Sequence, residues 1–372
     1  MSGLSLYIHA PFCARRCCYC DFAVTVDRAP DAIAWLDAVE RELAGTIERE
    51  RLGRPRLLTL YLGGGTPSLL GPGALPRLRD RLERHADIAD GAEWTAEANP
   101  ESFSAALAAD WRAAGVNRLS FGAQSFDPAV LRWMGRLHGP AGPARAVQTA
   151  RNAGFDNLSL DLIFGLPARL GRDWAADLER ALSLGPDHIS LYGLTAESRT
   201  PLGRRVAAGE ERLADEEAYG AEYLLAADVL AAAGLRHYEV SNFARPDRES
   251  RHNVAYWTMR PYLGLGPGAH SYVPPRRWWN ERDWAGYREK VTAGGSAVEA
   301  EEVVGDSASA LERSWLGLRT TEGVDAGTEA RVRLGRTWAS NGWATLEHGR
   351  LRLTPLGWLL LDRLAVEYDA AA

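Results

Sequence analysis

The sequence predicts an α/β protein: a parallel (β/α) barrel over residues 1–290, followed by a small, winged-helix-like α+β domain over residues 300–372. Three observations lead to this prediction. Short apolar segments alternate with segments of helical periodicity, as in parallel βα units. Polar and glycine-rich sequences follow the apolar segments, where the chemistry of such barrels collects. The composition then changes at about residue 290.

Length and composition limit the possible classes of protein. A chain of 372 residues suffices for one large domain and a smaller one, and a hydrophobic fraction of 46% can supply a sizeable core. The net charge of -6 argues against a nucleic-acid surface, which normally shows a basic excess. We find no apolar run near the ~20 residues of a membrane span and no basic, apolar leader. Clustered reduced cysteines are typical of the cytoplasm, where we expect the protein.

The barrel begins with a strand at residues 4–8, which delivers a cysteine-rich loop at its carboxyl end. An amphipathic helix is expected over residues 31–50. Its apolar residues recur at helical spacing: Ile33, Leu36, Val39, Leu43 and Ile47. Further strands are expected at residues 57–62, 94–98, 118–121, 158–164 and 189–192. Since these strands end in or near glycines or polar residues, the polar sequences gather at one end of the predicted barrel.

The C-terminal segment has a different pattern. A helix is expected at residues 309–318, a strand pair at residues 344–346 and 351–353, and a last helix from Pro355 to about Tyr368. This order is typical of a winged helix. A winged helix often binds DNA, but the acidic chain and the lack of a basic recognition helix argue against that role.

All four cysteines lie within eight residues: Cys13, Cys17, Cys18 and Cys20. Thiols this close could form only short, strained disulfide rings, so they indicate a metal or cluster site. The C-x3-C-x2-C spacing of Cys13, Cys17 and Cys20 can bind three irons of a cubane and leave the fourth open, whereas electron-transfer clusters take four cysteines. A zinc knuckle is the alternative, but no second C-x2-C or H-x3-H pair completes it. Cys18 could replace Cys17 as a ligand, which would give C-x4-C-x1-C, but we expect it to be a non-ligand neighbour.

Two further groups of residues follow predicted strands. Residues 63–67 read Gly-Gly-Gly-Thr-Pro; glycines let a ligand's amino group approach the backbone carbonyls, although a tight turn would use the same residues. Four polar residues lie in, at or just past other strands: Glu97, Gln124, Arg136 and Asp161. A carboxylate within an apolar strand is costly without a partner. Asp161 therefore caps a helix, pairs with Arg136, or contacts a ligand.

With these motifs the chain resembles the radical S-adenosylmethionine (SAM) enzymes, a partial, TIM-like parallel barrel in which three cysteines hold a [4Fe-4S] cluster and SAM binds its open iron. The resemblance implies that Cys13, Cys17 and Cys20 ligate such a cluster. It implies that the stretch containing Gly64, Gly65 and Thr66 receives the methionine amino group of SAM. It also implies further SAM contacts: Tyr7, Glu97, Gln124, Arg136 and Asp161.

Motifs between Tyr7 and Tyr272, among them YIHAPFC, GGGTPS, EANPES, GAQSF and DLIFGLP, resemble the coproporphyrinogen-oxidase-like branch of that superfamily. True oxygen-independent coproporphyrinogen III oxidases carry a further cysteine two residues after the last cluster cysteine and a long N-terminal extension. Here Phe22 takes that position, and six residues precede Tyr7. Residues 252–257 instead read HNVAYW, an element of the HemW-type haem chaperones, which bind haem and pass it to acceptor proteins.

The resemblance to haem chaperones implies haem as a third ligand, with His252 as a haem contact or, alternatively, as a hydrogen-bonded structural residue. It implies haem-acceptor proteins as partners, membrane-bound respiratory enzymes among the candidates, and therefore transient presence at the membrane surface. We expect a monomer or homodimer and assign no catalytic side chain. The alternative function is oxidative decarboxylation of coproporphyrinogen III, and a different radical SAM reaction also stays open.

Overall fold

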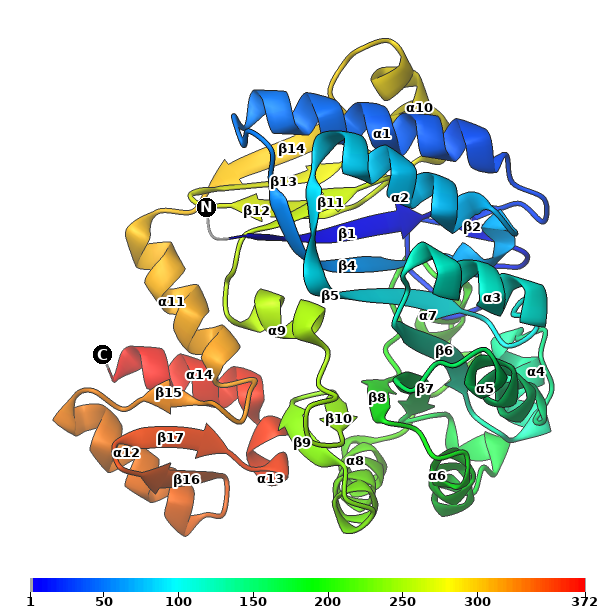
Figure 1. Cartoon of the computed structure of the whole chain (residues 1–372). Helices are drawn as coiled ribbons and strands as arrows, with labels where there is room; N and C mark the ends of the chain where they lie inside the picture. Colours follow the sequence, from blue (N-terminus) through cyan, green and yellow to red (C-terminus); the bar gives the residue numbers. More distant parts are fainter. Residues whose placement is uncertain (1–2, 372) are drawn as a thin grey trace.

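The computed structural model describes residues 3–371, in which one twelve-stranded sheet runs through most of the chain (Figure 1). The central strands run parallel: β1 (Leu4–Ala10), β4 (Arg56–Gly64), β5 (Asp87–Ala98), β6 (Arg118–Gln124), β7 (Leu158–Phe164) and β8 (His188–Gly193). β11 (Tyr262–Leu265) pairs with β1 in parallel as well. The predicted parallel βα barrel is thereby confirmed.

Antiparallel strands extend the sheet on both sides. β12 (His270–Val273), β13 (Arg276–Asn280) and β14 (Val298–Val303) follow β11, and β10 (Asn242–Ala244) and β9 (Arg236–Glu239) follow β8. β14 and β9 are the two ends of the strand order, so the barrel is partial. The sheet includes residues up to Val303, beyond the change of composition at about residue 290.

The core lies between the sheet and the helices on its outer face (Figure 1). These helices are α1 (Ala32–Arg49), α2 (Ala74–His85), α3 (Ala105–Ala114), α5 (Gly142–Asn152), α6 (Trp174–Ser183) and α8 (Glu216–Ala232). Alternate strand residues face this core; Leu119 and Phe121 of β6, for example, are fully buried. Their neighbours Arg118 and Ser120 face the inside of the barrel, which is consequently lined by polar side chains.

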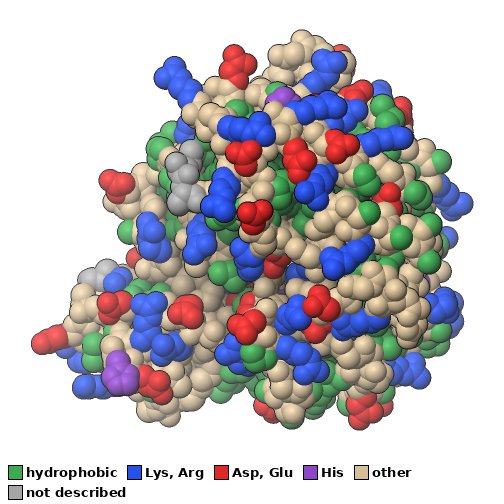
Figure 2. Space-filling model, viewed as in Figure 1, with side chains coloured by type: hydrophobic (Ala, Val, Ile, Leu, Met, Phe, Trp, Pro, Cys, Tyr) green, Lys and Arg blue, Asp and Glu red, His purple; other side chains and the backbone are tan. Residues whose placement is uncertain are grey.

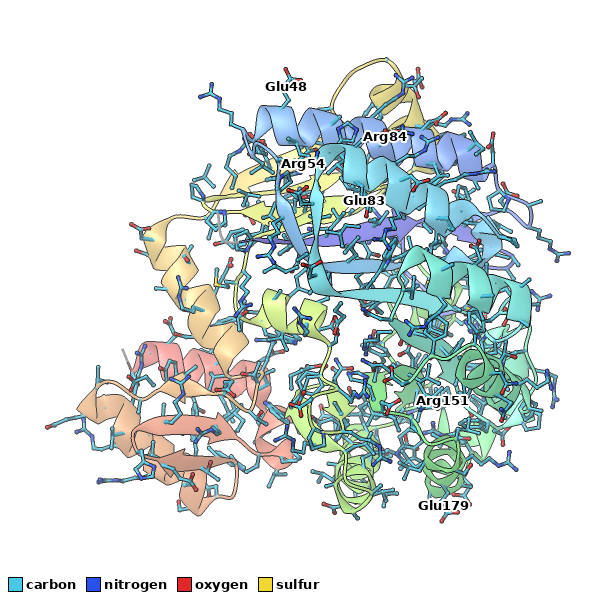
Figure 3. All side chains as sticks on the ribbon, viewed as in Figure 1. Glu48, Arg54, Glu83, Arg84, Arg151 and Glu179 are labelled. Carbon is cyan, nitrogen blue, oxygen red and sulfur yellow. The ribbon has the colours of Figure 1, made fainter. Side chains whose placement is uncertain are left out.

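Side chains at the helix ends fix where the helices begin and stop. Asp31 accepts from the amide of Ala34 at the start of α1, close to the predicted boundary. At the carboxyl end of α2, Arg54 donates to the carbonyl oxygens of Glu83 (2.6 Å) and Arg84 (3.1 Å), so a side chain from the loop before β4 caps this helix (Figure 3).

Five short elements lie near the ends of the barrel. β2 (Phe12–Cys13) and β3 (Thr25–Val26) frame the cysteine loop, and α4 (Pro128–Met134) lies beside it. α7 (Pro201–Ala207) also contacts this loop, because the amide of Leu202 donates to the carbonyl oxygen of Cys18 at 2.8 Å. α9 (Arg251–Trp257) packs against β4 and its first turn is bound by Glu93 of β5.

The C-terminal part forms a small α+β unit at the lower left of Figure 1. Its three-stranded antiparallel sheet consists of β15 (Val324–Asp325), β17 (Arg350–Leu353) and β16 (Ala344–Glu347). Its helices are α11 (Asp306–Gly317), α12 (Glu329–Ser340), α13 (Pro355–Trp358) and α14 (Leu361–Ala370). The predicted strand pair is confirmed, whereas the single last helix is wrong, because the chain leaves the helix at Leu359 and Leu360.

The division of the helix has a packing reason. The indole nitrogen of Trp358 donates to the carbonyl oxygen of Leu318 at 2.9 Å. A Cβ on Gly357 would lie 1.9 Å from the carbonyl oxygen of Trp343, so this turn packs directly against the backbone at residue 343. Between residues 3 and 371, no helix is both long and apolar enough to cross a membrane.

Candidate cluster and cofactor site

The cysteine loop leaves the carboxyl end of β1 and is closed by the pairing of β2 with β3. Cys13, Cys17, Cys18 and Cys20 are all free thiols and partly exposed. The amide of Cys20 donates to the carbonyl oxygen of Cys17 at 3.3 Å, which folds the last part of the loop into a turn. The predicted ligands therefore share one short, accessible loop.

Cys18 contacts the backbone of α4. Its Sγ lies 3.4 Å from the carbonyl oxygen of Trp133, and its amide donates to the carbonyl oxygen of Met134 at 3.3 Å. That Cys18 is not a cluster ligand stays a prediction; in the structure its thiol and its amide both contact the backbone of α4.

Polar groups contact two of the predicted ligand sulfurs. The hydroxyl of Thr66 lies 3.6 Å from Cys13 Sγ, and Arg136 Nη1 lies 3.8 Å from Cys17 Sγ. Asn99 connects the two, because its amide nitrogen donates to the Thr66 hydroxyl at 3.0 Å and its oxygen accepts from Arg136 at 2.6 Å. These donors would stabilise negative charge on the thiolates and on a cluster bound to them.

The glycines at the end of β4 lie where a side chain would not fit. A Cβ on Gly65 would stand 2.6 Å from the carbonyl oxygen of Phe12, and one on Gly64 would stand 2.4 Å from the His9 ring. Gly64 also has a φ of 107°, which other residues rarely adopt. The backbone of β4 thus approaches the start of the cysteine loop closely.

Glu97, at the end of β5, lies against this glycine turn. Its two carboxylate oxygens accept from the Tyr61 hydroxyl (2.8 Å) and from the amide of Gly64 (3.1 Å). Burial, with a contribution from the charge of Asp161, raises the pKa of Glu97 to about 7. Asp161 accepts from the Ser120 hydroxyl at 3.0 Å, and burial raises the pKa of its carboxyl as well. Two carboxyl groups therefore face the inside of the barrel near the site.

Gln124 and Arg136 meet at the end of β6. Arg136 donates to the carbonyl oxygen of Gly122 at 2.7 Å, and a Cβ on Gly122 would lie 2.8 Å from Gln124 Nε2. Gln124 has a φ of 65°, a strained conformation for a residue with a side chain. Such strain is often found where a side chain is aimed at a ligand.

Tyr7 is the predicted contact on β1. Its hydroxyl donates to His9 Nδ1 at 2.9 Å, because the other ring nitrogen of His9 donates to the carbonyl oxygen of Ala23 at 2.8 Å. The Tyr7 ring also lies 6.1 Å from that of Tyr61. Through His9, Tyr7 of β1 is therefore connected to Ala23, which follows the last cysteine of the loop.

His252 lies deeper in the barrel, on α9, and is 1% exposed. Its Nδ1 is 2.8 Å from the Thr59 hydroxyl and its Nε2 is 2.8 Å from the Tyr256 hydroxyl. Burial lowers the pKa of the ring to about 3, so it is neutral. Both nitrogens are in use, and contact with a haem iron would first require the release of one of these hydroxyls. These contacts favour the structural alternative for His252.

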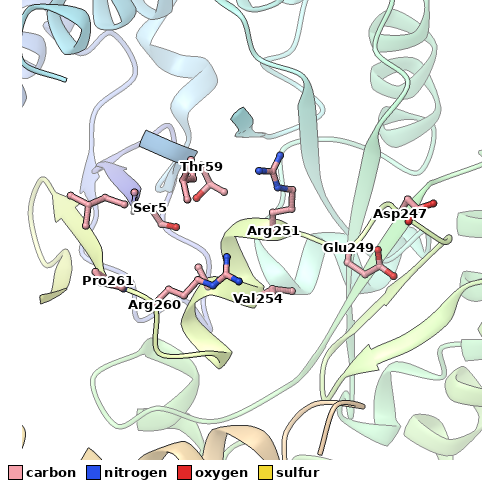
Figure 4. A pocket seen from close by; sticks show the side chains of 12 residues that line it. Ser5, Thr59, Asp247, Glu249, Arg251, Val254, Arg260 and Pro261 are labelled. Atoms are coloured by element: carbon pink, nitrogen blue, oxygen red, sulfur yellow. The ribbon is translucent and has the colours of Figure 1, made fainter. Parts of the chain in front are cut away.

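A pocket of about 400 Å³ opens at the opposite end of the strands (Figure 4). Ser5, Thr59 and residues of the segment around α9, such as Arg251 and Arg260, line it. It lies at the amino ends of β1 and β4, whereas the cysteine loop follows the carboxyl end of β1. The pocket is therefore not the predicted cofactor site.

The donor chemistry of the site fits a cluster and SAM. Free thiols, a backbone turn without Cβ atoms, and cationic and hydroxyl groups beside the sulfurs occur together around Cys13, Cys17 and Arg136. Among residues 3–371, no three His, Cys, Asp or Glu side chains converge on a single-ion site. A cubane does not require such convergence, because each thiolate binds a different iron.

The sequence reasoning missed two residues of this site. Asn99 links Thr66 to Arg136, and Tyr61 holds Glu97. Asn99 stood in the quoted motif EANPES, so its position after a strand was an available signal. Tyr61 lies inside an apolar strand, where only the alternation of inner and outer residues could have indicated it.

On the face seen in Figure 2, acidic and basic side chains are interspersed.

Comparison with known proteins places the chain in a family. Residues 7–181 match the model of the radical SAM superfamily. The chain is 38% identical to the "Heme chaperone HemW" of Mycobacterium tuberculosis (strain CDC 1551 / Oshkosh), over 96% of this chain and 92% of that protein. It is 36% identical to the protein of the same name from Bacillus subtilis (strain 168), over 86% of this chain and 84% of that one.

A solved structure supports the same fold. Coproporphyrinogen III oxidase (HemN) from Escherichia coli, described as a radical SAM enzyme, matches with a TM-score of 0.83 and 24% identity, covering 100% of this chain and 91% of that one. With a curated relative 38% identical along almost its whole length, the chain belongs to the HemW-type family of radical SAM proteins.

Proposed function

We propose that the protein is a haem chaperone, which binds haem and transfers it to acceptor proteins. The similarity to relatives named heme chaperone HemW, at 38% identity over 96% of the chain, carries this proposal. Phe22 supports it, because the oxidases of this branch are expected to have a cysteine there. The acceptors would be haem-requiring proteins, membrane-bound respiratory enzymes among them, reached from the cytoplasm by a monomer or homodimer.

We further propose that Cys13, Cys17 and Cys20 hold a [4Fe-4S] cluster and that SAM binds beside it. When bound, such a cluster can supply an electron for the cleavage of SAM. Arg136 and Thr66 would stabilise the thiolates, because each lies beside a ligand sulfur. The turn at Gly64 and Gly65 would admit the amino group of SAM, with Tyr7, Glu97, Gln124 and Asp161 around the rest of the molecule.

Haem transfer from the cluster-reconstituted protein tests the main proposal. The protein is loaded anaerobically with haem, freed of excess, and mixed with the haem-free form of a haem-requiring respiratory enzyme. We expect the acceptor to gain activity faster than with the same concentration of free haem. A protein that binds no haem, or a transfer no faster than from free haem, would contradict the chaperone function.

The alternative function is the oxidative decarboxylation of coproporphyrinogen III, because the fold resembles that of coproporphyrinogen III oxidase. The reconstituted protein would be incubated anaerobically with coproporphyrinogen III, SAM and a reductant, and the products separated by chromatography. We expect no product above background. Protoporphyrinogen in molar excess over protein would make this a decarboxylating enzyme instead.

The role of His252 can be tested through its partner Tyr256. If His252 binds haem iron, the Tyr256→Phe variant frees Nε2 and should bind haem more tightly, while His252→Ala should alter the absorption spectrum of bound haem. We expect neither effect, because the ring is buried and doubly hydrogen-bonded. Instead, His252→Ala should unfold at a lower denaturant concentration with its haem spectrum unchanged.

A further inference from the structure

We propose that the inner face of the barrel contains a carboxylate-binding site at Arg118, and that this site takes a propionate group of haem. The inference rests on the proposed haem-chaperone function and adds to it a position for the ligand. It depends on an arginine that the strands bury and that has no anionic partner among residues 3–371.

Arg118 begins β6 and is 2% exposed. Along this strand, Leu119 and Phe121 face the helices, so Arg118 and Ser120 face the inside of the barrel. The contact of Ser120 with Asp161 on β7 confirms which face this is. The guanidinium therefore lies in the polar interior, on the same face as the SAM candidates.

Within the described part of the chain, Arg118 forms no ion pair. Its hydrogen bond to the Thr95 hydroxyl is long, at 3.5 Å, and its Nε is buried without a partner. Arg172, which is also buried, differs: it donates to Glu222 at 2.6 Å and lies 3.9 Å from Asp177. Burying a charge is unfavourable unless it is paired, so the partner of Arg118 is expected to come from a ligand.

The carboxylates of the barrel interior are already bound elsewhere. Glu97 accepts from Tyr61 and Gly64, and Asp161 accepts from Ser120. Arg118 influences both only at longer range, where its charge opposes the rise of their pKa values. A guanidinium fork with a free Nε matches the two oxygens of an additional carboxylate.

Aromatic side chains near Arg118 suit a flat ligand that carries such a carboxylate. Thr95 pairs in register with Tyr61 on one side and with Arg118 on the other. The Tyr61 ring lies 6.1 Å from the Tyr7 ring, which pairs with it on the neighbouring strand β1. Since adjacent strands lie about 4.8 Å apart, Arg118 is roughly 10 Å across the sheet from Tyr61. A porphyrin lying against these tyrosines would extend its propionates toward Arg118.

The proposed site is tested by comparing the binding of haem with that of haem dimethyl ester, which lacks both carboxylates. The affinity of the cluster-reconstituted protein for each is measured by absorption titration, for the wild type and for Arg118→Gln. We expect the wild type to bind haem about tenfold more tightly than the ester. Arg118→Gln should lose that difference by weakening haem binding alone. Arg56→Gln, which removes an exposed arginine at the start of β4, should behave as the wild type.

Other outcomes would overturn the inference. If Arg118→Gln binds haem as the wild type does, or weakens haem and ester equally, Arg118 is not a propionate anchor. If the variant loses SAM affinity instead, Arg118 serves the carboxylate of SAM. Should the variant fail to fold, the wild type still decides, because equal affinities for haem and ester exclude the site. A wild type that binds neither ligand removes the proposed function itself.

Discussion

Individual buried polar residues hold the parts of the barrel together around the site. Glu42 of α1 is an example: its carboxylate accepts from the amide of Gly266 (2.7 Å), from the Tyr287 hydroxyl (2.6 Å) and from Asn280. These partners come from β13, α10 (Trp284–Thr292) and the loop after β11. One carboxyl group thus joins the long first helix to the antiparallel edge of the sheet.

The pH dependence of stability should reveal Glu42. Burial raises its pKa from 4.5 to about 7, so the folded protein takes up this proton more readily than the unfolded chain. Its contribution to stability is therefore greatest below the unfolded pKa and falls as the pH rises through about 7. Relative to Glu42→Gln, the wild type should lose about 2–3 kcal/mol of unfolding free energy between pH 5 and pH 8.

Urea unfolding at several pH values measures this difference. Glu48→Gln is the matched control, since Glu48 is exposed on the same helix (Figure 3). Parallel pH profiles for the wild type and Glu42→Gln would show that Glu42 does not bind the proton.

The cysteine register can be tested at the same scale. Cys17→Ala should lose the cluster on reconstitution, whereas Cys18→Ala should keep it, because Cys18 contacts the backbone of α4. Iron and sulfide analysis with electron paramagnetic resonance of the reduced protein measures the cluster. Loss of iron in Cys18→Ala would show that Cys18 is a ligand and that the predicted register is wrong.

At the scale of elements, α4 links the sheet to the cysteine loop. Its first turn is capped by Asp127, whose carboxylate accepts from the amides of Ala129 (2.6 Å) and Val130 (3.1 Å). Its last residues accept from Cys18, and Arg136 follows directly. The position of Arg136 beside Cys17 therefore depends on where this short helix begins and ends.

Removal of the cap should affect both stability and the site. Asp127→Ala should lower the unfolding free energy by about 1 kcal/mol and weaken SAM binding several-fold, because α4 no longer holds Arg136 firmly. Asp283→Ala removes the equivalent cap of α10, where the carboxylate accepts from Gly286 at 3.0 Å. It should cause a similar loss of stability with unchanged SAM affinity. Equal SAM affinities in both variants would contradict this role of α4.

At the scale of the whole molecule, one hydrophobic core connects the barrel to the C-terminal unit. Leu4 and Phe243 of the barrel belong to the same buried cluster as Trp358 and Tyr368. The ring centroids of Trp358 and His237 are 4.3 Å apart. The His237 ring stacks on the Phe243 ring with a centroid distance of 3.8 Å. The predicted units 1–290 and 300–372 are therefore not separated by a polar interface at this point.

This continuity predicts cooperative unfolding. Calorimetry should show one transition, and Trp358→Ala should lower its midpoint for the entire protein, by an amount equivalent to about 3–5 kcal/mol. Val366→Ala, at a site 57% exposed on α14, should have little effect. Two separate transitions, with only the smaller one shifted by Trp358→Ala, would show that the units fold independently.

Sequence reasoning predicted the repeated units and the positions of most site residues, but not the contacts among them. Five expected strands end within about two residues of their place in the structure, because apolar segments and the glycines after them are local signals. The last helix was predicted as one piece because its sequence contains no proline or glycine where it divides. The division follows from the packing of Gly357 and Trp358 against segments distant in sequence.

The order of residues along the chain was enough to predict the parallel βα architecture and the cysteine loop, since periodicity and close thiol spacing are properties of contiguous residues. It also determined the family, because the motifs are short runs of neighbours. The three-dimensional arrangement of the strands was needed to show that Asn99 joins Thr66 to Arg136, that His252 is fully hydrogen-bonded, and that buried Arg118 forms no ion pair within residues 3–371. These facts depend on which strands lie side by side, and hydrogen bonds between distant strands leave no pattern along the chain.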